Sequence, residues 1–146
     1  MPIFVGLALA LAVAAFARIA GLDRDRAFYP VVLIVVASYY ILFAAMAGGE
    51  GLFAELAIFV LFGATAILGF RTSLWFVAAG LALHGIFDFT RHLWLAGRGV
   101  PEWWPAFCGA FDLAAPAVLA AILLFGKHPS ASPEAERAIN EPPRRA

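Results

Sequence analysis

The sequence predicts an all-α protein that crosses a membrane as a bundle of five helices. Of its 146 residues, 64% are hydrophobic and 14% are charged, and the mean hydropathy is +0.90. A soluble domain typically has about a quarter charged residues and about half apolar ones. The apolar residues gather into segments of the roughly 20 residues that a membrane-spanning helix needs. The length of the chain allows one domain.

Five segments have the length and the composition of spanning helices. We expect these helices at residues 2–20, 27–47, 51–70, 72–96 and 102–125. Glycine, serine and proline residues separate them, as turn chemistry predicts. The first segment could be a signal peptide, but its arginines follow the apolar run, which reverses the order in a secretory signal. We therefore expect a retained first helix and one transmembrane domain over residues 1–126.

The distribution of basic residues predicts an orientation. Eight lysines and arginines fall on the side of the first and third predicted connections and the C-terminal segment, and two fall on the other side. Because basic residues are enriched on the cytoplasmic side, we expect an N-terminus outside and a C-terminus inside a bacterial inner membrane. Residues 127–146 carry four prolines and no apolar stripe, which predicts a disordered cytoplasmic tail.

Charge and cysteine content exclude several classes of function. The formal net charge is zero, so no overall field attracts nucleic acid. The single cysteine, Cys108, excludes a disulfide within the chain. The partners that we expect are membrane lipids and a lipidic small molecule, with a second copy of the chain as a further candidate.

A polar stripe interrupts the fourth predicted helix. His84, Asp88 and His92 are spaced by four residues, and residues four apart share one face of a helix. The fifth predicted helix has the same spacing at Cys108 and Asp112. Ionisable groups at membrane depth cost several kcal/mol and are candidates for function.

These two helices form a predicted hairpin whose turn centres near Val100. Folding the chain there brings Asp88 level with Asp112, roughly 12 Å below the hairpin rim at 1.5 Å per residue. Glu55, one turn into the third helix, lies at the same end. The other level pairs are His92 with Cys108 and His84 with Pro116. The sequence therefore predicts a polar site in the outer half of the bundle.

One interpretation of this site is a divalent metal such as zinc. The candidate ligands are Asp88, His92 and Asp112, followed by Glu55 and Cys108. Histidine and carboxylate side chains are the usual ligands of zinc, and an open coordination position activates water. His84 and His92 lie roughly 12 Å apart along one helix, so they cannot share one ion.

Other interpretations need no metal. His84, Asp88, His92 and Asp112 are candidate catalytic residues for acid/base chemistry, because two facing aspartates separate into an acid and a base. The predicted function is a small membrane enzyme acting on a lipid-like substrate. The alternative is a non-enzymatic subunit or a small transporter, in which the cluster relays protons or fixes the packing of helices.

The stretch from "LHGIFDFTRHLW" to "VPEWWPAFCGAFDLAAPA" resembles a family of small integral membrane proteins of bacteria and fungi. That family has a His-x3-Asp-x3-His-Leu helix, a loop with proline and a Cys-x3-Asp helix. The matching residues here are His84, Asp88, His92, Leu93, Pro101, Cys108 and Asp112. The resemblance covers about the last third of the chain and implies the site without naming a reaction. A looser likeness to ceramidase-type membrane hydrolases lacks their seven spans and their serine, so it is analogy only.

Overall fold

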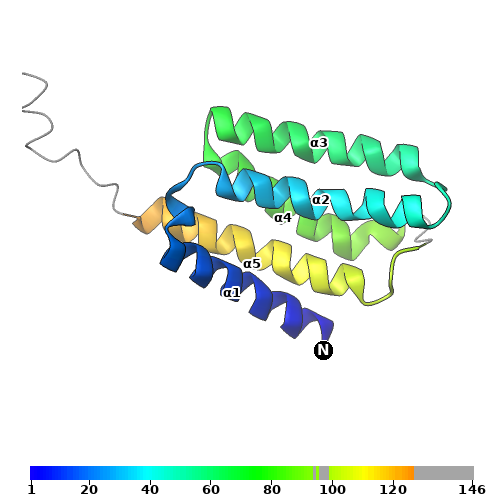
Figure 1. Ribbon diagram of the computed structural model, residues 1–146, viewed down its shortest axis with the longest axis horizontal. Coiled ribbons are helices and arrows are strands. Elements are labelled where there is room, and N and C mark those ends of the chain that lie inside the picture. Colours follow the sequence, from blue (N-terminus) through cyan, green and yellow to red (C-terminus); the bar gives the residue numbers. More distant parts are fainter. Residues whose placement is uncertain (94, 96–98, 127–146) are drawn as a thin grey trace, which may run out of the picture.

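The computed structural model of the protein describes residues 1–93, 95 and 99–126, and all of the regular structure in these residues is helical. The all-α bundle predicted from the sequence is confirmed. The five helices are α1 (Pro2–Ala20), α2 (Phe28–Met46), α3 (Leu52–Arg71), α4 (Leu74–Thr90) and α5 (Trp104–Phe125), and they lie side by side with alternating direction (Figure 1). The prediction of a disordered tail at 127–146 falls outside the described residues.

Four of the helices, α1, α2, α3 and α5, are long and apolar enough to cross a membrane. Large hydrophobic side chains point outward from all of them, which suits a lipid environment and not water. The helix α4 is shorter, with 17 residues, and carries His84 and Asp88 on its buried face. The protein is therefore a polytopic membrane protein.

The predicted ends of α4 and α5 differ most from the structure. The helix α4 ends at Thr90 and not at position 96, and residues Arg91–Leu93 form a 3₁₀ turn. The Thr90 hydroxyl, on the last residue of α4, donates to the Ile86 carbonyl oxygen at 2.9 Å. The helix α5 begins at Trp104, two residues later than predicted, with Pro105 in its first turn.

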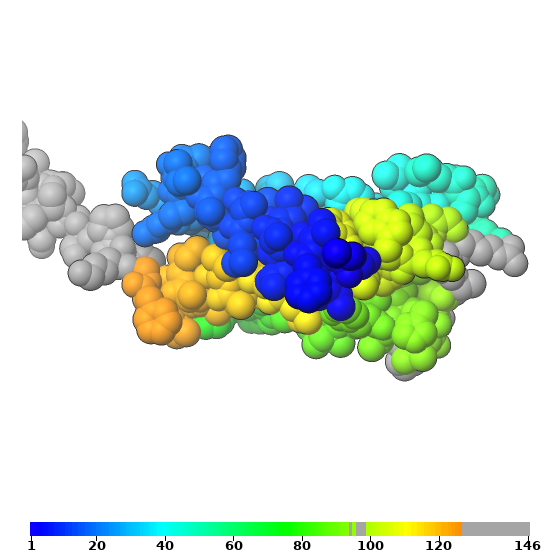
Figure 2. Space-filling model, turned by 90° about the horizontal axis from the view of Figure 1, so that it is seen from below, coloured from blue at the N-terminus to red at the C-terminus, as the bar shows by residue number. Residues whose placement is uncertain are grey.

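The helix α5 packs against α4 on one side and against α1 on the other, while α2 packs against α3. The space-filling view shows α1 lying over α5 (Figure 2). Glycines make the closest approaches possible. A Cβ added at Gly6 of α1 would lie 2.1 Å from the Phe107 carbonyl oxygen, and one added at Gly85 of α4 would lie 3.1 Å from the Gly109 carbonyl oxygen. Small residues at helix contacts are the usual way for helices to associate in membranes.

The end of the bundle where α3 connects to α4 is closed by an arginine. The Arg26 guanidinium donates to the carbonyl oxygens of Phe70 at 2.6 Å, Gly69 at 3.2 Å and Thr72 at 2.7 Å. These carbonyls lie at the C-terminus of α3, where they have no partner within the helix. A cation at this position also suits the negative end of the helix dipole.

Candidate functional site

The buried charged and ionisable side chains gather in one half of the bundle. This half contains the N-terminus of α1, the connection from α2 to α3, and the ends of α4 and α5 that face each other in the chain (Figure 1). The buried polar residues there are Glu55, His84, Asp88, Arg91 and Asp112. The clustering at one end that the sequence predicted is therefore present, on side chains that are shielded from solvent.

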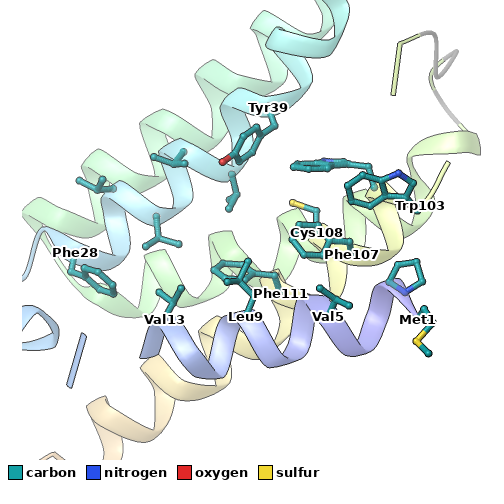
Figure 3. A pocket seen from close by; sticks show the side chains of 16 residues that line it. Met1, Val5, Leu9, Val13, Phe28, Tyr39, Trp103, Phe107, Cys108 and Phe111 are labelled. Atoms are coloured by element: carbon teal, nitrogen blue, oxygen red, sulfur yellow. The ribbon is translucent and has the colours of Figure 1, made fainter. Parts of the chain in front are cut away.

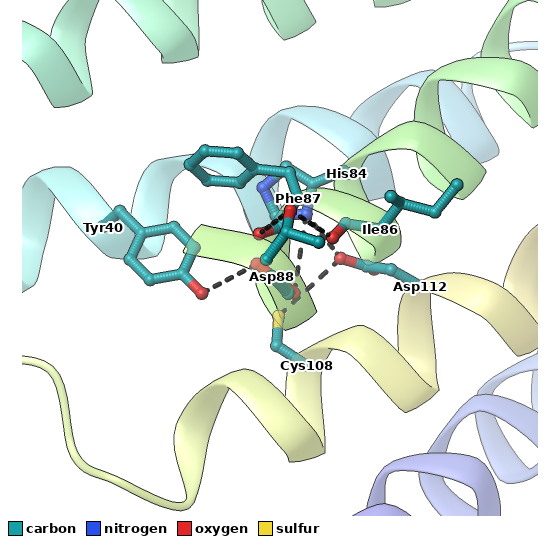
Figure 4. A network of polar contacts seen from close by, with 8 residues as sticks. Tyr40, His84, Ile86, Phe87, Asp88, Cys108 and Asp112 are labelled. Atoms are coloured by element: carbon teal, nitrogen blue, oxygen red, sulfur yellow. Dashed lines mark hydrogen bonds and ion pairs between the residues drawn. The ribbon is translucent and has the colours of Figure 1, made fainter. Parts of the chain in front are cut away.

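The centre of the cluster is a group of three residues, His84, Asp88 and Asp112, which we call the His–Asp group. His84 Nδ1 lies 2.6 Å from Asp112 Oδ2 and 3.8 Å from Asp88 Oδ2. The three side chains are completely buried or nearly so, and one potential ligand atom of each lies within 4.8 Å of the others. The two helices thus turn these side chains toward each other, as Figure 4 shows.

The register between α4 and α5 differs from the predicted one. Asp112 lies opposite His84 and not opposite Asp88, so the hairpin centres slightly before Val100. The reason lies in the backbone contact beneath the site. A Cβ at Gly85 would lie 3.2 Å from the backbone carbon of Asp112, so the glycine next to His84 brings the α4 backbone to the level of Asp112.

Two further side chains hold the aspartates. The Tyr40 hydroxyl of α2 donates to Asp88 Oδ1 at 2.7 Å. The Cys108 thiol, one turn before Asp112 on α5, lies 3.7 Å from Asp112 Oδ2 and donates to it. The His–Asp group is therefore fixed from three helices, with Tyr40 donating to Asp88 and Cys108 donating to Asp112.

A buried ion pair continues the network toward α3. The Arg91 guanidinium donates to Glu55, and its central carbon lies 4.4 Å from the centre of the Tyr40 ring. Both charged side chains are about 4% exposed, so they balance each other in a buried environment. The 3₁₀ turn after α4 is what directs Arg91 inward. Glu55 thus belongs to an ion pair and not to the group of three.

His92 does not join the site. The sequence placed it on one stripe with His84 and Asp88, but the helix ends at Thr90 and His92 is exposed in the 3₁₀ turn. The geometric basis for His92 as a metal ligand or catalytic residue is therefore wrong. The structure brings together His84, Asp88 and Asp112, with Cys108 beside them. Tyr40 and Arg91 complete the network, although the sequence singled out neither as a site residue.

Several polar atoms of the His–Asp group lack a hydrogen-bond partner. Within the described part of the chain, these are His84 Nε2, Asp88 Oδ2 and Asp112 Oδ1. A buried polar atom without a partner costs about 1–3 kcal/mol, and more for a charged group. One imidazole and two carboxylates are a donor set that suits a divalent cation such as zinc, and the nitrogen that faces both carboxylates is His84 Nδ1 and not the unpartnered Nε2.

A long apolar groove lies on the other side of Cys108. It runs between α1 and α2 over α5 and has a volume of about 770 Å³ (Figure 3). Its walls are valine, leucine and phenylalanine side chains, with Tyr39, Trp103 and Trp104 toward one end. Cys108 lines the groove and also contacts Asp112, so one side chain separates the groove from the His–Asp group. Sequence reasoning did not find this groove, since it depends on how the helices are spaced.

The fold and the site together define an all-helical membrane protein with a buried histidine–aspartate group near one end of its bundle. Comparisons of the chain with protein family models, with curated proteins and with solved structures gave no match. The resemblance to the small bacterial and fungal membrane proteins stays a prediction.

Proposed function

We propose that the protein is a small integral membrane enzyme that binds a divalent metal ion at His84, Asp88 and Asp112 and acts on a lipid-like substrate. The observation that carries this proposal is the convergence of two buried carboxylates on one imidazole nitrogen, His84 Nδ1. With the basic residues on the cytoplasmic side, as we expect from their distribution, this site would lie in the outer half of a bacterial inner membrane.

The charge of the buried cluster supports a cation. The ion pair of Arg91 and Glu55 is balanced by itself. A protonated His84 would balance one of the two aspartates, and the other would then stay buried as a costly charge or take up a proton. A divalent cation would balance both carboxylates while the imidazole stays neutral and acts as a ligand. Zinc accepts this nitrogen and oxygen donor set at about 2.0–2.2 Å.

Such an ion would polarise a carbonyl or phosphoryl oxygen of the substrate or activate a water molecule. The chain's own residues would orient the ligands, Tyr40 through Asp88 and Cys108 through Asp112. Hydrogen bonds from neighbouring side chains to metal-binding residues fix the orientation of those residues. Because the site lies among spanning helices, a substrate dissolved in the membrane reaches it more readily than one dissolved in water.

Elemental analysis of the purified protein tests the metal site. We expect about one zinc or similar divalent ion per chain after purification with zinc supplied, because the three ligands are preorganised. Asp88→Asn, Asp112→Asn and His84→Gln should each lose the ion. Asp25→Asn is the matched control, since Asp25 is exposed and its Oδ1, which accepts from the Ala27 N–H, is an atom that asparagine keeps. A folded wild-type protein that retains no ion under these conditions contradicts the proposal.

A second candidate function is structural, as part of a non-enzymatic subunit. The observation that favours it is that the same contacts join helices, His84 to Asp112 across α4 and α5, and Tyr40 to Asp88 across α2 and α4. In this case no metal is found, and Asp112→Asn lowers thermal stability without affecting any ligand. A proton relay gives a third result, a proton flux in liposomes that stops in the Asp112→Asn variant.

A further inference from the structure

The groove between α1 and α2 is formed by helices that are long and apolar enough to cross a membrane. Both of these helices are candidate spans, and so is α5, which forms its floor. In the part of the chain that the structure describes, the helices that line the groove are α1, α2 and α5. Figure 3 shows Val5, Leu9, Phe107 and Phe111 along its walls. In a bilayer, lipid would surround this apolar groove.

The dimensions of the groove match one leaflet. Its lining runs from Pro2 to Val13 along α1 and from Phe28 to Tyr39 along α2. At 1.5 Å per residue each run is roughly 16 Å long. The hydrocarbon core of a bilayer is about 30 Å thick, so the groove extends over about the depth of one leaflet's acyl chains.

One end of the groove has the chemistry of a membrane interface. Tyr39, Trp103 and Trp104 lie there, and the rings of Tyr39 and Trp104 are 5.0 Å apart in an edge-to-face contact. Tyrosine and tryptophan are enriched at the level of lipid headgroups, because they combine an apolar ring with a polar atom. The groove therefore has a headgroup end at the rim, and its apolar remainder runs toward the middle of the bundle.

The rim end is also the end next to the His–Asp group. Cys108 lines the groove one turn after Trp104, and its thiol donates to Asp112. In Figure 3 the sulfur of Cys108 points into the groove, between α2 and α1. A lipid that lies in the groove with its chain pointing inward places the polar end of that chain close to Cys108.

We propose that this groove binds one acyl chain of a membrane lipid, taken from the leaflet at the N-terminal end of α1, and that it positions the lipid's ester region beside Cys108 and the His–Asp group. This inference rests on the proposed function, for which it names the substrate class as lipids with an acyl chain. The lipid-binding part can be tested without the metal.

Native mass spectrometry of the protein with palmitoyl-oleoyl phosphatidylcholine in detergent tests the groove. We expect one lipid per chain to be retained with saturation. The double variant Leu9→Phe/Val35→Phe fills the groove from both walls and should lower the affinity for this lipid by about tenfold, or ~1.4 kcal/mol. Both side chains are partly exposed, at 44% and 45%, so the bundle tolerates the larger rings.

The matched control is Val60→Phe/Leu61→Phe, which makes the same two replacements at exposed positions of α3 outside the groove. It should bind lipid like the wild type. Equal lipid retention by both double variants, or lipid uptake that rises without saturation, overturns the inference. A different occupant, such as a second copy of the chain, would give a dimer that the groove variant abolishes, which also overturns it.

Metal content measured in the same samples separates this inference from the proposed function. The groove variant should keep its metal ion, because Leu9 and Val35 touch none of the three ligands. The Asp112→Asn variant should lose the ion and still bind one lipid. Saturable lipid binding in a protein that holds no metal would support the lipid-binding groove and contradict the proposed metal-dependent enzyme.

Discussion

The two halves of this bundle are held together by different forces. In the half that Arg26 closes, the helices meet through completely buried apolar side chains. The largest of these are Leu33, Val77, Leu81 and Leu119. In the other half the helices meet through the His–Asp group, the Tyr40 hydroxyl and the ion pair of Arg91 with Glu55. The second half thus adds buried polar contacts to apolar ones such as that of Gly6 with Phe107, while the first half relies on apolar side chains.

This difference bears on function because the polar half is not the cheaper way to pack helices. A hydrogen bond between membrane helices contributes about 0.6 kcal/mol on average. Buried ionisable groups cost more than that when their atoms lack partners, as Asp88 Oδ2 and Asp112 Oδ1 do in the described residues. The apolar half shows that this fold packs without such groups. This cost is the reason to propose a metal site there, and the structural candidate function predicts instead that the polar residues only join the helices.

The largest expected effect on stability comes from removing the buried ion pair of the polar half. Arg91→Met should lower the free energy of unfolding by about 3–5 kcal/mol, since it leaves Glu55 as an unpaired buried charge. Unfolding in mixed detergent micelles, followed by tryptophan fluorescence, measures the change. The double variant Arg91→Met/Glu55→Gln should recover most of the loss, because no charge is then left buried. If the single and double variants are equally unstable, the unpaired charge of Glu55 is not the cause of the loss, and the prediction is wrong.

The second effect breaks the apolar half. Leu33→Ala should lower the free energy of unfolding by about 2–5 kcal/mol, because it leaves a cavity among completely buried side chains. Leu42→Ala on the same helix is the matched control, since Leu42 is 51% exposed and its removal leaves no cavity. The metal content of Leu33→Ala should equal that of the wild type. A loss of metal in this variant would show that the two halves do not act separately.

The number and approximate bounds of the helices could be predicted from the sequence. A helix that crosses a membrane needs a long apolar run whatever its neighbours are, so α1, α2 and α3 can be read from composition alone. Their observed ends lie within about a residue of the predicted ones, a range in which helix ends commonly vary. The residues at which connections occur carry glycine or charge, which is visible without any tertiary information.

The site was harder to predict because it depends on where α4 stops. A spacing of four residues indicates a common face only while the helix continues. The pattern from His84 to His92 crosses a helix end at Thr90, and the sequence has no proline or glycine there to mark it. The 3₁₀ turn exchanges His92 for Arg91 on the buried side. The partner that makes this exchange favourable, Glu55, lies on a different helix.

The smallest expected effect on stability belongs to Tyr40→Phe, which tests whether the polar half does more than pack helices. Tyr40→Phe removes the hydroxyl that donates to Asp88 and leaves the ring in place, so the free energy of unfolding should fall by about 1–3 kcal/mol, because the buried Asp88 Oδ1 then lacks a partner. If the His–Asp group binds a metal, the same change should weaken metal affinity by about 10–100-fold, as the loss of a hydrogen bond to a metal-binding residue does. Competition with a chelator measures this affinity. Tyr39→Phe, at the neighbouring residue, is the control and should change neither quantity. If the Tyr40→Phe protein is less stable but binds its ion as tightly as the wild type, Tyr40 only packs helices. The polar half would then serve helix packing, as the apolar half does.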